Sequence, residues 1–326
     1  NNQGFSEIQK ESSSSTGNIR NRMGLTTSRS LGVNATYDWK RVKLRSNIQY
    51  VGTDRLEDSR TTVDNYIRKD KSITRSTNNS RTENNNLVAN AFLEWKMDSV
   101  TTLIFRPQYR FSANDRENKG FQEGWGNDVL LNEKVSSGSS HNSQYNVTMM
   151  LQLSRKLSQK GRNVALKVDY GTNSSSNDRK NLSTTHYFKN DREDSKNQKI
   201  EDDINGYNYR VQLVYVEPLL WMHHLQLRYS YQYKVNNSDR FVYDWNEDLG
   251  EFTPDYDESA SNQFENQYSN HLLNLAVRTS RKKYNYNVGV DLEPQKSVSH
   301  SLLSDPPEEP LKRSVLNFSP TVNFRY

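Results

Sequence analysis

Hydrophobic and polar residues alternate along several stretches of the chain, most regularly between Val211 and Tyr233. Every second position from Leu225 to Tyr233 is leucine or tyrosine, and the positions between them are polar. Successive side chains of a β-strand point to opposite faces, so this period of two predicts a strand with one apolar and one polar face. The segment that starts at Val211 alternates in the same way, and Pro218, which cannot donate to a strand ladder, lies between the two segments. The stretch therefore predicts a β-hairpin.

The hairpin pattern recurs along the chain. Predicted hairpins cover about 31–50, 87–111, 145–170, 211–233 and 273–292, and a last strand runs from about 314 to 326. Short turns such as Lys40-Arg41 connect the strands within a hairpin, whereas polar segments at about 52–84, 113–143, 172–205 and 235–266 are predicted as long loops between hairpins. Residues 1 to about 24 are rich in serine and asparagine and predict a loop or a frayed entry into a strand. Pro107 weakens the strand prediction around it, because an interior proline removes a ladder hydrogen bond.

Short turns that alternate with long polar loops are typical of outer-membrane barrels, in which the turns are periplasmic and the loops extracellular. The pattern gives about eleven strands, whereas bacterial barrels close with an even number. We therefore predict an all-β fold in which residues 1–326 form a single region of a partial, antiparallel, up-and-down transmembrane β-barrel, with a plug and further strands outside this chain. The alternative is a secreted propeller or stacked-sheet adhesin, whose strands also alternate. The hairpin period of about sixty residues, with long loops on one side only, argues against that alternative.

The apolar face of each predicted strand is expected to contact lipid, and aromatic residues near the strand ends are expected to form two girdles at the membrane interfaces. The predicted lipid-facing residues are Leu93, Leu103, Phe105, Leu151, Leu166, Leu213, Leu227, Tyr229, Leu275, Val288 and Val290. The predicted girdle residues are Trp39, Trp95 and Trp221 near the short turns, and Tyr50, Phe111, Tyr170 and Tyr233 toward the loops.

The opposite face carries charge that a lipid-facing surface does not tolerate but a barrel interior does. We predict that Lys43, Arg45, Arg106, Arg110, Lys167, Asp169, Arg210 and Arg228 face the lumen. Two interpretations remain open: these side chains bond to a plug and to one another, or they favour anionic ligands in the lumen.

Composition refines this picture. Hydrophobic residues make up only 32% of the chain, but 11% is aromatic, with 19 tyrosines, which is unlike a disordered chain. The sequence contains no run of 18 apolar residues, so it does not predict a transmembrane helix. A membrane-spanning β-strand needs only about ten residues. The 44 basic and 39 acidic residues nearly balance and are not clustered, so a nucleic-acid partner is not expected. The first ten residues, NNQGFSEIQK, lack the apolar core of a signal peptide, so a mature or truncated N-terminus is expected.

Candidates for chemistry are few. The chain has no cysteine, which excludes disulfides and thiolate sites. His223-His224 is interpreted as a solvated turn rather than a metal site, because adjacent strand residues face opposite ways. A barrel lipase would need Ser, His and a carboxamide on the lipid face, and the pattern shows no such trio. Glycines 120, 124 and 126 predict a flexible loop rather than a phosphate site. The weak metal candidate is a calcium-loop-like spacing at Asp244, Asn246, Asp248 and Asp255, in which Leu249 replaces the usual glycine. No enzymatic activity and no cofactor are expected.

Several segments resemble an outer-membrane β-barrel family associated with TonB-dependent receptors of Bacteroidota. They are SRKLSQKGRNVALKVDYG at 154–171, YVEPL at 215–219, SNQFENQYSNHLLNLAVR at 261–278 and LNFSPTVNFRY at 316–326. In YVEPL, Val216 replaces a threonine of the family pattern. The resemblance covers 145–326 and none of its motifs is catalytic. It implies an integral protein of the Gram-negative outer membrane whose partners are outer-membrane lipid, a plug domain and further strands, with TonB and a surface lipoprotein as additional partners.

The expected function is therefore that of a wall segment in a TonB-dependent-receptor-like transporter that takes up a nutrient. The alternative is a barrel without a transport role, either a scaffold for surface-protein assembly or secretion, or a surface adhesin. Plug and TonB-box sequences upstream of Asn1 would distinguish the two.

Overall fold

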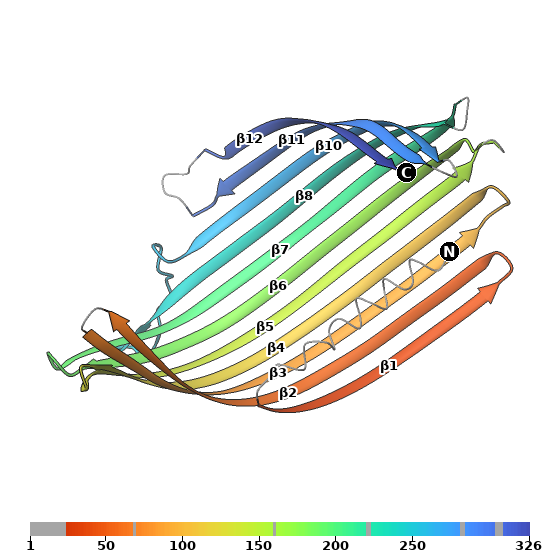
Figure 1. The fold of residues 1–326 in the computed structure, drawn as a ribbon. Coiled ribbons are helices and arrows are strands. Elements are labelled where there is room, and N and C mark those ends of the chain that lie inside the picture. The colour runs from red at the N-terminus through yellow and green to blue at the C-terminus, as the bar shows by residue number, and fades with distance from the viewer. Residues whose placement is uncertain (1–23, 68–69, 159–160, 220–222, 281–283, 304–308) are drawn as a thin grey trace.

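The computed structural model describes residues 24–67, 70–158, 161–219, 223–280, 284–303 and 309–326, and these form a single curved antiparallel sheet (Figure 1). The strands in the described part are β1 (Leu25–Trp39), β2 (Val42–Ile67), β3 (Asp70–Lys96), β4 (Thr101–Gly126), β5 (Val129–Lys156), β6 (Asn163–Tyr187), β7 (Arg192–Pro218), β8 (His223–Asn246), β9 (Glu251–Phe252), β10 (Asn262–Ser280), β11 (Asn285–Ser301) and β12 (Leu311–Arg325). Among these residues, no helix is long and apolar enough to cross a membrane. The prediction of an all-β fold is confirmed.

Each strand pairs with its neighbours in chain order from β1 to β8, followed by β10, β11 and β12, while the two-residue β9 pairs only with β8. Eleven strands therefore form the main path, as the alternation predicts. The sheet is open in Figure 1, with β1 and β12 at its two edges. This up-and-down arrangement fits the predicted partial barrel.

The predicted long loops at 52–84, 113–143 and 172–205 are wrong. β4 and β5 are 26 and 28 residues long, and only Asn127 and Asp128 separate them. Both have positive φ angles, of 48° and 64°, as a tight primed hairpin turn requires. In the segment 235–266, β8 continues to Asn246, and irregular structure is confined mainly to 247–261. Alternation fails to predict these extensions because both of their faces are polar.

The apolar positions form rows across the strands. One such row takes one apolar or aromatic residue from every strand of the main path. Each of these residues is the cross-strand partner of the row residue on the next strand. The row consists of Trp39, Val42, Trp95, Leu103, Leu153, Leu166, Leu213, Tyr229, Leu273, Leu292 and Phe318.

Burial is the reverse of that in a water-soluble protein. Leu213, Leu227 and Leu275 in the apolar parity are 45%, 42% and 45% exposed. In the opposite parity Gln226 and Ser230 are each 6% exposed and Asn274 is 8% exposed. Alternate residues of each strand point to opposite faces of the sheet. We call the face with the enclosed polar side chains the concave face, and the face with the apolar side chains the convex face.

Two prolines interrupt the ladder inside strands. The β3–β4 ladder pairs Asn90 with Gln108 and resumes at Leu93 and Phe105, so it is broken opposite Pro107, whereas the β4–β5 ladder stays continuous there. The β10–β11 ladder is broken in the same way opposite Pro294. Since proline has no N–H, the ladder loses a hydrogen bond on one side of the strand only. The doubt that Pro107 raised about this strand is answered by this one-sided break.

Candidate functional site

The concave face of the strands collects the charged residues that the sequence predicts for a lumen. Arg106 is the partner of Met150, Met150 of Asp169, and Asp169 of Arg210, so these charged residues lie in one row across β4 to β7. The parities of the remaining predicted residues place them on the same face. They are Lys43, Arg45, Arg110, Lys167 and Arg228.

Part of this charge is satisfied within the sheet. Lys167 Nζ lies 2.9 Å from Asp169 Oδ1, and Arg210 donates to Gln232 Oε1 at 2.6 Å. Nearer the short turns of β8, β10 and β11, the enclosed Asn274 donates to Asp291 Oδ1 at 2.5 Å. Other groups stay unsatisfied: the Nε atoms of Arg106 and Arg228 are shielded from solvent and have no hydrogen-bond partner within the described residues. The face therefore combines one ion pair and two amide hydrogen bonds with two arginines, Arg106 and Arg228, whose Nε atoms have no partner.

Beyond the apolar rows, small amides and hydroxyls line the concave face of the extensions. Asn84, Asn114, Asn142 and Asn177 are successive partners on β3 to β6. Asn114 donates to Asn84 Oδ1, and Asn84 donates to Thr53 Oγ1 at 3.2 Å. The row continues to Asp202 on β7, which accepts from Arg179. The sequence pattern did not predict this surface, because the opposite face of these segments is not apolar and the register that aligns the asparagines cannot be read from the sequence.

The convex face carries every predicted lipid-facing residue. Leu93, Phe105 and Leu151 are successive partners, and Leu227, Leu275 and Val290 form a second such series. Leu103, Leu166, Leu213 and Tyr229 lie in the continuous apolar row, and Val288 is the partner of Val277 on the same face. That lipid contacts this face stays a prediction.

The predicted girdle residues Trp39, Trp95, Tyr50, Phe111, Tyr170 and Tyr233 lie on the convex parity, while Trp221 lies outside the described residues. An aromatic cluster adjoins Tyr170 and Tyr233. Tyr209 lies 5.7 Å from Tyr233 between ring centroids, and the Tyr229 hydroxyl is 2.9 Å from His271 Nδ1. The amphipathic rings of Tyr170, Tyr209 and Tyr233 suit the boundary between hydrocarbon and water.

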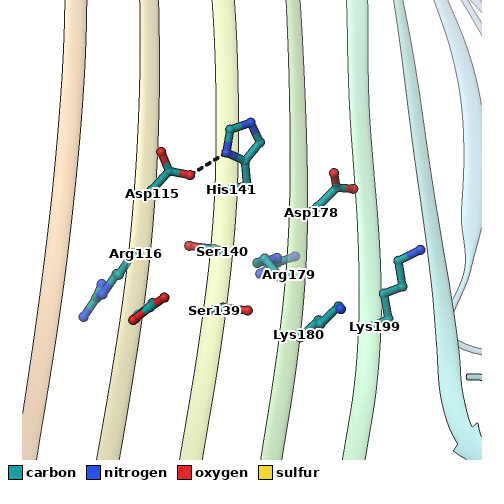
Figure 2. Close-up of a pocket in the computed structure, with 10 residues that line it drawn as sticks. Asp115, Arg116, Ser139, Ser140, His141, Asp178, Arg179, Lys180 and Lys199 are labelled. Atoms are coloured by element: carbon teal, nitrogen blue, oxygen red, sulfur yellow. Dashed lines mark hydrogen bonds and ion pairs between the residues drawn. The ribbon is translucent and has the colours of Figure 1, made fainter. Parts of the chain in front are cut away.

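A shallow pocket of about 230 Å³ lies on the extensions of β4 to β7 (Figure 2). At its rim His141 Nδ1 and Asp115 Oδ1 are 2.5 Å apart, and Ser139 lies two residues from His141 on the same parity. A serine, a histidine and a carboxylate thus lie near one another on the convex parity of the extensions, but the group has no carboxamide and lies outside the predicted lipid face, so the expectation about a barrel lipase stays a prediction. No hydrogen bond links a serine to His141 among the described residues, so the group lacks the nucleophile contact of a hydrolase.

The same pair is one link in a row of charged partners. The row crosses six neighbouring strands through Asp54, Glu83, Asp115, His141, Asp178 and Glu201. Next to it Arg81 donates to both carboxylate oxygens of Asp54, at 3.2 and 2.8 Å, and this bonding lowers the pKa of Asp54. The His141–Asp115 contact is therefore one cross-strand pair in a register row whose other members are carboxylates.

The other chemical candidates are not assembled. Asn246 Oδ1 accepts from the backbone N–H groups of Asp248 and Leu249, at 2.9 and 3.1 Å, and Asp244 accepts from Gln198 at 2.8 Å. Across the described residues no three His, Asp or Glu side chains are placed to hold a metal ion, so the calcium-like spacing that includes Asp255 does not form a site. His223 is not a solvated turn residue, since its Nδ1 contacts the hydroxyls of Thr279 and Tyr286.

Of the comparisons with known proteins, the match to a family model agrees with the fold. The model of the outer membrane protein β-barrel family matches residues 155–326, just over half of the chain. No curated protein matches this sequence. Among solved structures, the translocator domain of autotransporter NalP from Neisseria meningitidis is 11% identical, with 90% of this chain and 94% of that chain covered and a TM-score of 0.20. A TodX monoaromatic hydrocarbon channel mutant is 8% identical, with 85% and 88% covered and a TM-score of 0.25. The β domain of the Bordetella autotransporter Brka is 7% identical, with 93% and 98% covered and a TM-score of 0.17. TM-scores this low carry no functional argument.

Proposed function

Since the chain belongs to the outer membrane protein β-barrel family and is integral to the bacterial outer membrane, we propose that it forms part of the wall of a transporter that takes up a polar nutrient. The convex face then contacts lipid and the concave face lines an aqueous lumen. One observation carries this proposal: nine of the eleven residues in the apolar row are exposed and Val42 and Leu103 are half-buried, while Gln226, Ser230 and Asn274 on the other face are buried. A water-filled interior accommodates these charged and amide side chains, and hydrocarbon does not.

The transporter we propose is of the TonB-dependent-receptor type. Support for this finer assignment comes from the segments at 154–171, 215–219, 261–278 and 316–326, which resemble the barrel family associated with such receptors in Bacteroidota. The mechanism would be ligand capture on the extracellular side, followed by movement of a plug along the concave face with energy from the inner membrane. In this proposal Arg106 and Arg228 serve the plug or the ligand, and this chain performs no covalent chemistry.

A second candidate function is a scaffold for surface-protein assembly or secretion. The observation that favours it is the length of the strands. β4 continues from Phe111 to Gly126, about 50 Å of strand at about 3.4 Å per residue, and beyond Phe111 most of its side chains are polar on both faces, with Phe121 and Trp125 as the large exceptions. Such a wall presents a large rigid surface beyond the bilayer. Deletion of the gene would lower uptake of a nutrient under the first proposal and the amount of a surface protein under the second.

Environment-sensitive fluorophores on the two parities test the assignment of faces. Labels at Leu227 and Val288 are expected to report lipid in vesicles, with blue-shifted emission and quenching by a lipid-soluble quencher. Labels at their neighbours Arg228 and Asn287 are expected to report water or protein. Equal polarity at both parities would refute the membrane wall.

A further inference from the structure

A short sequence pattern occurs twice at the proline-associated ladder breaks. On β4 it is Phe105-Arg106-Pro107-Gln108, opposite Asn90 to Leu93, and on β11 it is Leu292-Glu293-Pro294-Gln295, opposite Asn270 to Leu273. In both copies an asparagine faces the glutamine and a leucine faces the first residue of the pattern. The proline points to the convex face, so the charged residue before it points to the concave face. The two copies differ in the sign of this charge.

The acidic copy is satisfied within the sheet. Asn270 donates to Glu293 Oε1 at 2.6 Å, so the asparagine beside the break supplies the hydrogen bond that the carboxylate needs. In the basic copy the facing asparagine cannot neutralise the arginine, because an asparagine side chain carries no negative charge.

The basic copy is left without an anion. The guanidinium carbon of Arg106 lies 5.0 Å from the centroid of the Phe92 ring, which fixes the direction of the side chain. Within the described residues Arg106 has no hydrogen-bond or ion-pair partner, and its Nε is shielded from solvent. Asn90 Oδ1 is also shielded and unpartnered. The neighbouring Arg45 and Arg110 also have interactions of their own.

The Arg106 Nε is shielded and out of reach of a partner, whereas its two Nη nitrogens stay accessible and have no acceptor within the described residues. A partner that supplies an acceptor to these nitrogens adds charge-assisted hydrogen bonds. The planar fork of arginine matches a carboxylate, whose two oxygens accept two parallel N–H groups. The Asn90 side chain on the facing strand can also donate through its amide nitrogen.

We propose that Arg106, held against Phe92 at the Pro107 break and flanked by Asn90, is a carboxylate-binding site on the concave face. It rests on the proposed lumen and specifies its chemistry: the ligand is either a free carboxylate that enters the lumen or an aspartate or glutamate side chain of a polypeptide that fills it. Both sources share the carboxylate group and differ in how they reach the site.

Side-chain ¹⁵Nε NMR of the full chain in lipid nanodiscs tests the site. The Arg106 resonance is assigned with Arg106→Lys and titrated with propionate, with propionamide as the neutral match. A second titration uses the capped peptide Gly-Gly-Glu-Gly-Gly, with Gly-Gly-Gln-Gly-Gly as its match. A saturable shift with propionate supports a free ligand, and one seen only with the glutamyl peptide supports a polypeptide partner. No shift with either carboxylate, or equal shifts with the amides, overturns the proposal.

Calorimetry of variants separates Arg106 from general positive charge. Arg106→Gln is expected to weaken binding of the active probe about tenfold or more, because it removes a charge-assisted bidentate contact. Arg110→Gln, on the same face of the same strand, should leave the affinity within about twofold. Equal losses in the two variants would refute a specific site. If Arg106→Gln does not fold, the NMR titration of the unaltered chain with the carboxylate and amide probes still shows whether Arg106 binds a carboxylate. Failure here leaves the fluorophore test of the two faces untouched, so the two proposals fail separately.

Discussion

Replacement of Leu213 by arginine tests the convex face at the centre of its apolar row. Leu213 is the partner of Leu166 and Tyr229 and is 45% exposed. On β7 the outward positions from Tyr207 to Glu217 span about 34 Å of strand, or about 24 Å of height at a tilt of about 45°. This matches the apolar band of about 25 Å in outer-membrane barrels, and Leu213 lies near its middle. Arginine at the midplane is therefore expected to cost about 2–4 kcal/mol.

The matched control is Thr148→Arg on the opposite parity, where the cross-strand partners Gln108 and Gly171 are neutral. An arginine there faces the lumen and should change the free energy of unfolding by about 0.5 kcal/mol or less. Both values come from reversible guanidinium unfolding in phospholipid vesicles, followed by tryptophan fluorescence. A cost below about 0.5 kcal/mol for Leu213→Arg would mean that water covers the convex face, since exposed surface substitutions fall in that range. Equal costs at the two positions would also contradict a lipid-facing convex surface.

Two further predictions concern a turn and a ladder break. Asp98 Oδ1 accepts from the N–H groups of Val100 and Thr101 at 2.7 and 2.6 Å, and these bonds lower the pKa of its carboxyl group. Its contribution to stability is therefore full above the ordinary carboxyl pKa of about 3.9 and is lost as the pH falls through the lowered folded value. Asp98→Ala should lower the free energy of unfolding at neutral pH and reduce its fall at acid pH. Asp98→Asn should keep the turn but lose the pH dependence. If the free energy of unfolding falls at acid pH in both variants as it does in the unaltered chain, the reasoning is contradicted. Pro107→Ala restores an N–H toward β3 and should add about 0.5–1.5 kcal/mol and slow amide exchange at Ala91 and Phe92. Pro320→Ala, where the β11–β12 ladder is already continuous, should add no such protection, and equal protection in both variants would show that Pro107 does not cause the break.

The transmembrane part of the fold could be predicted from sequence because its two faces differ. Alternation between Leu225 and Tyr233 marks β8 directly, and the same contrast locates the other hairpins. The strand extensions could not be predicted in this way, because residues such as Asn114 and Asp115 are polar on both faces and produce no period of two. Serine, threonine and asparagine in these segments resemble loop composition, but cross-strand hydrogen bonds continue through them.

The candidate site was predicted only in part. Parity alone assigns Arg106, Asp169 and Arg210 to one face, as the structure confirms. Register decides which of them are neighbours, and register depends on turn geometry that the sequence does not fix. The surroundings of Arg106 could not be predicted at all, since they depend on the ladder break and on the side-chain contact with Phe92. The calcium-like spacing failed because Asn246 caps its own turn.

The ladder-bonded extensions also affect the entropy of any binding event beyond the bilayer. Flexible loops of the predicted length would lose conformational freedom when a molecule orders them, at a cost of about 1–2 kcal/mol per residue fixed. From Phe111 to Gly126 the chain is already fixed by hydrogen bonds to strands on both sides, so this cost is met during folding. A molecule that binds this wall therefore meets a preorganised surface, and mutations in it should alter dissociation rates more than association rates.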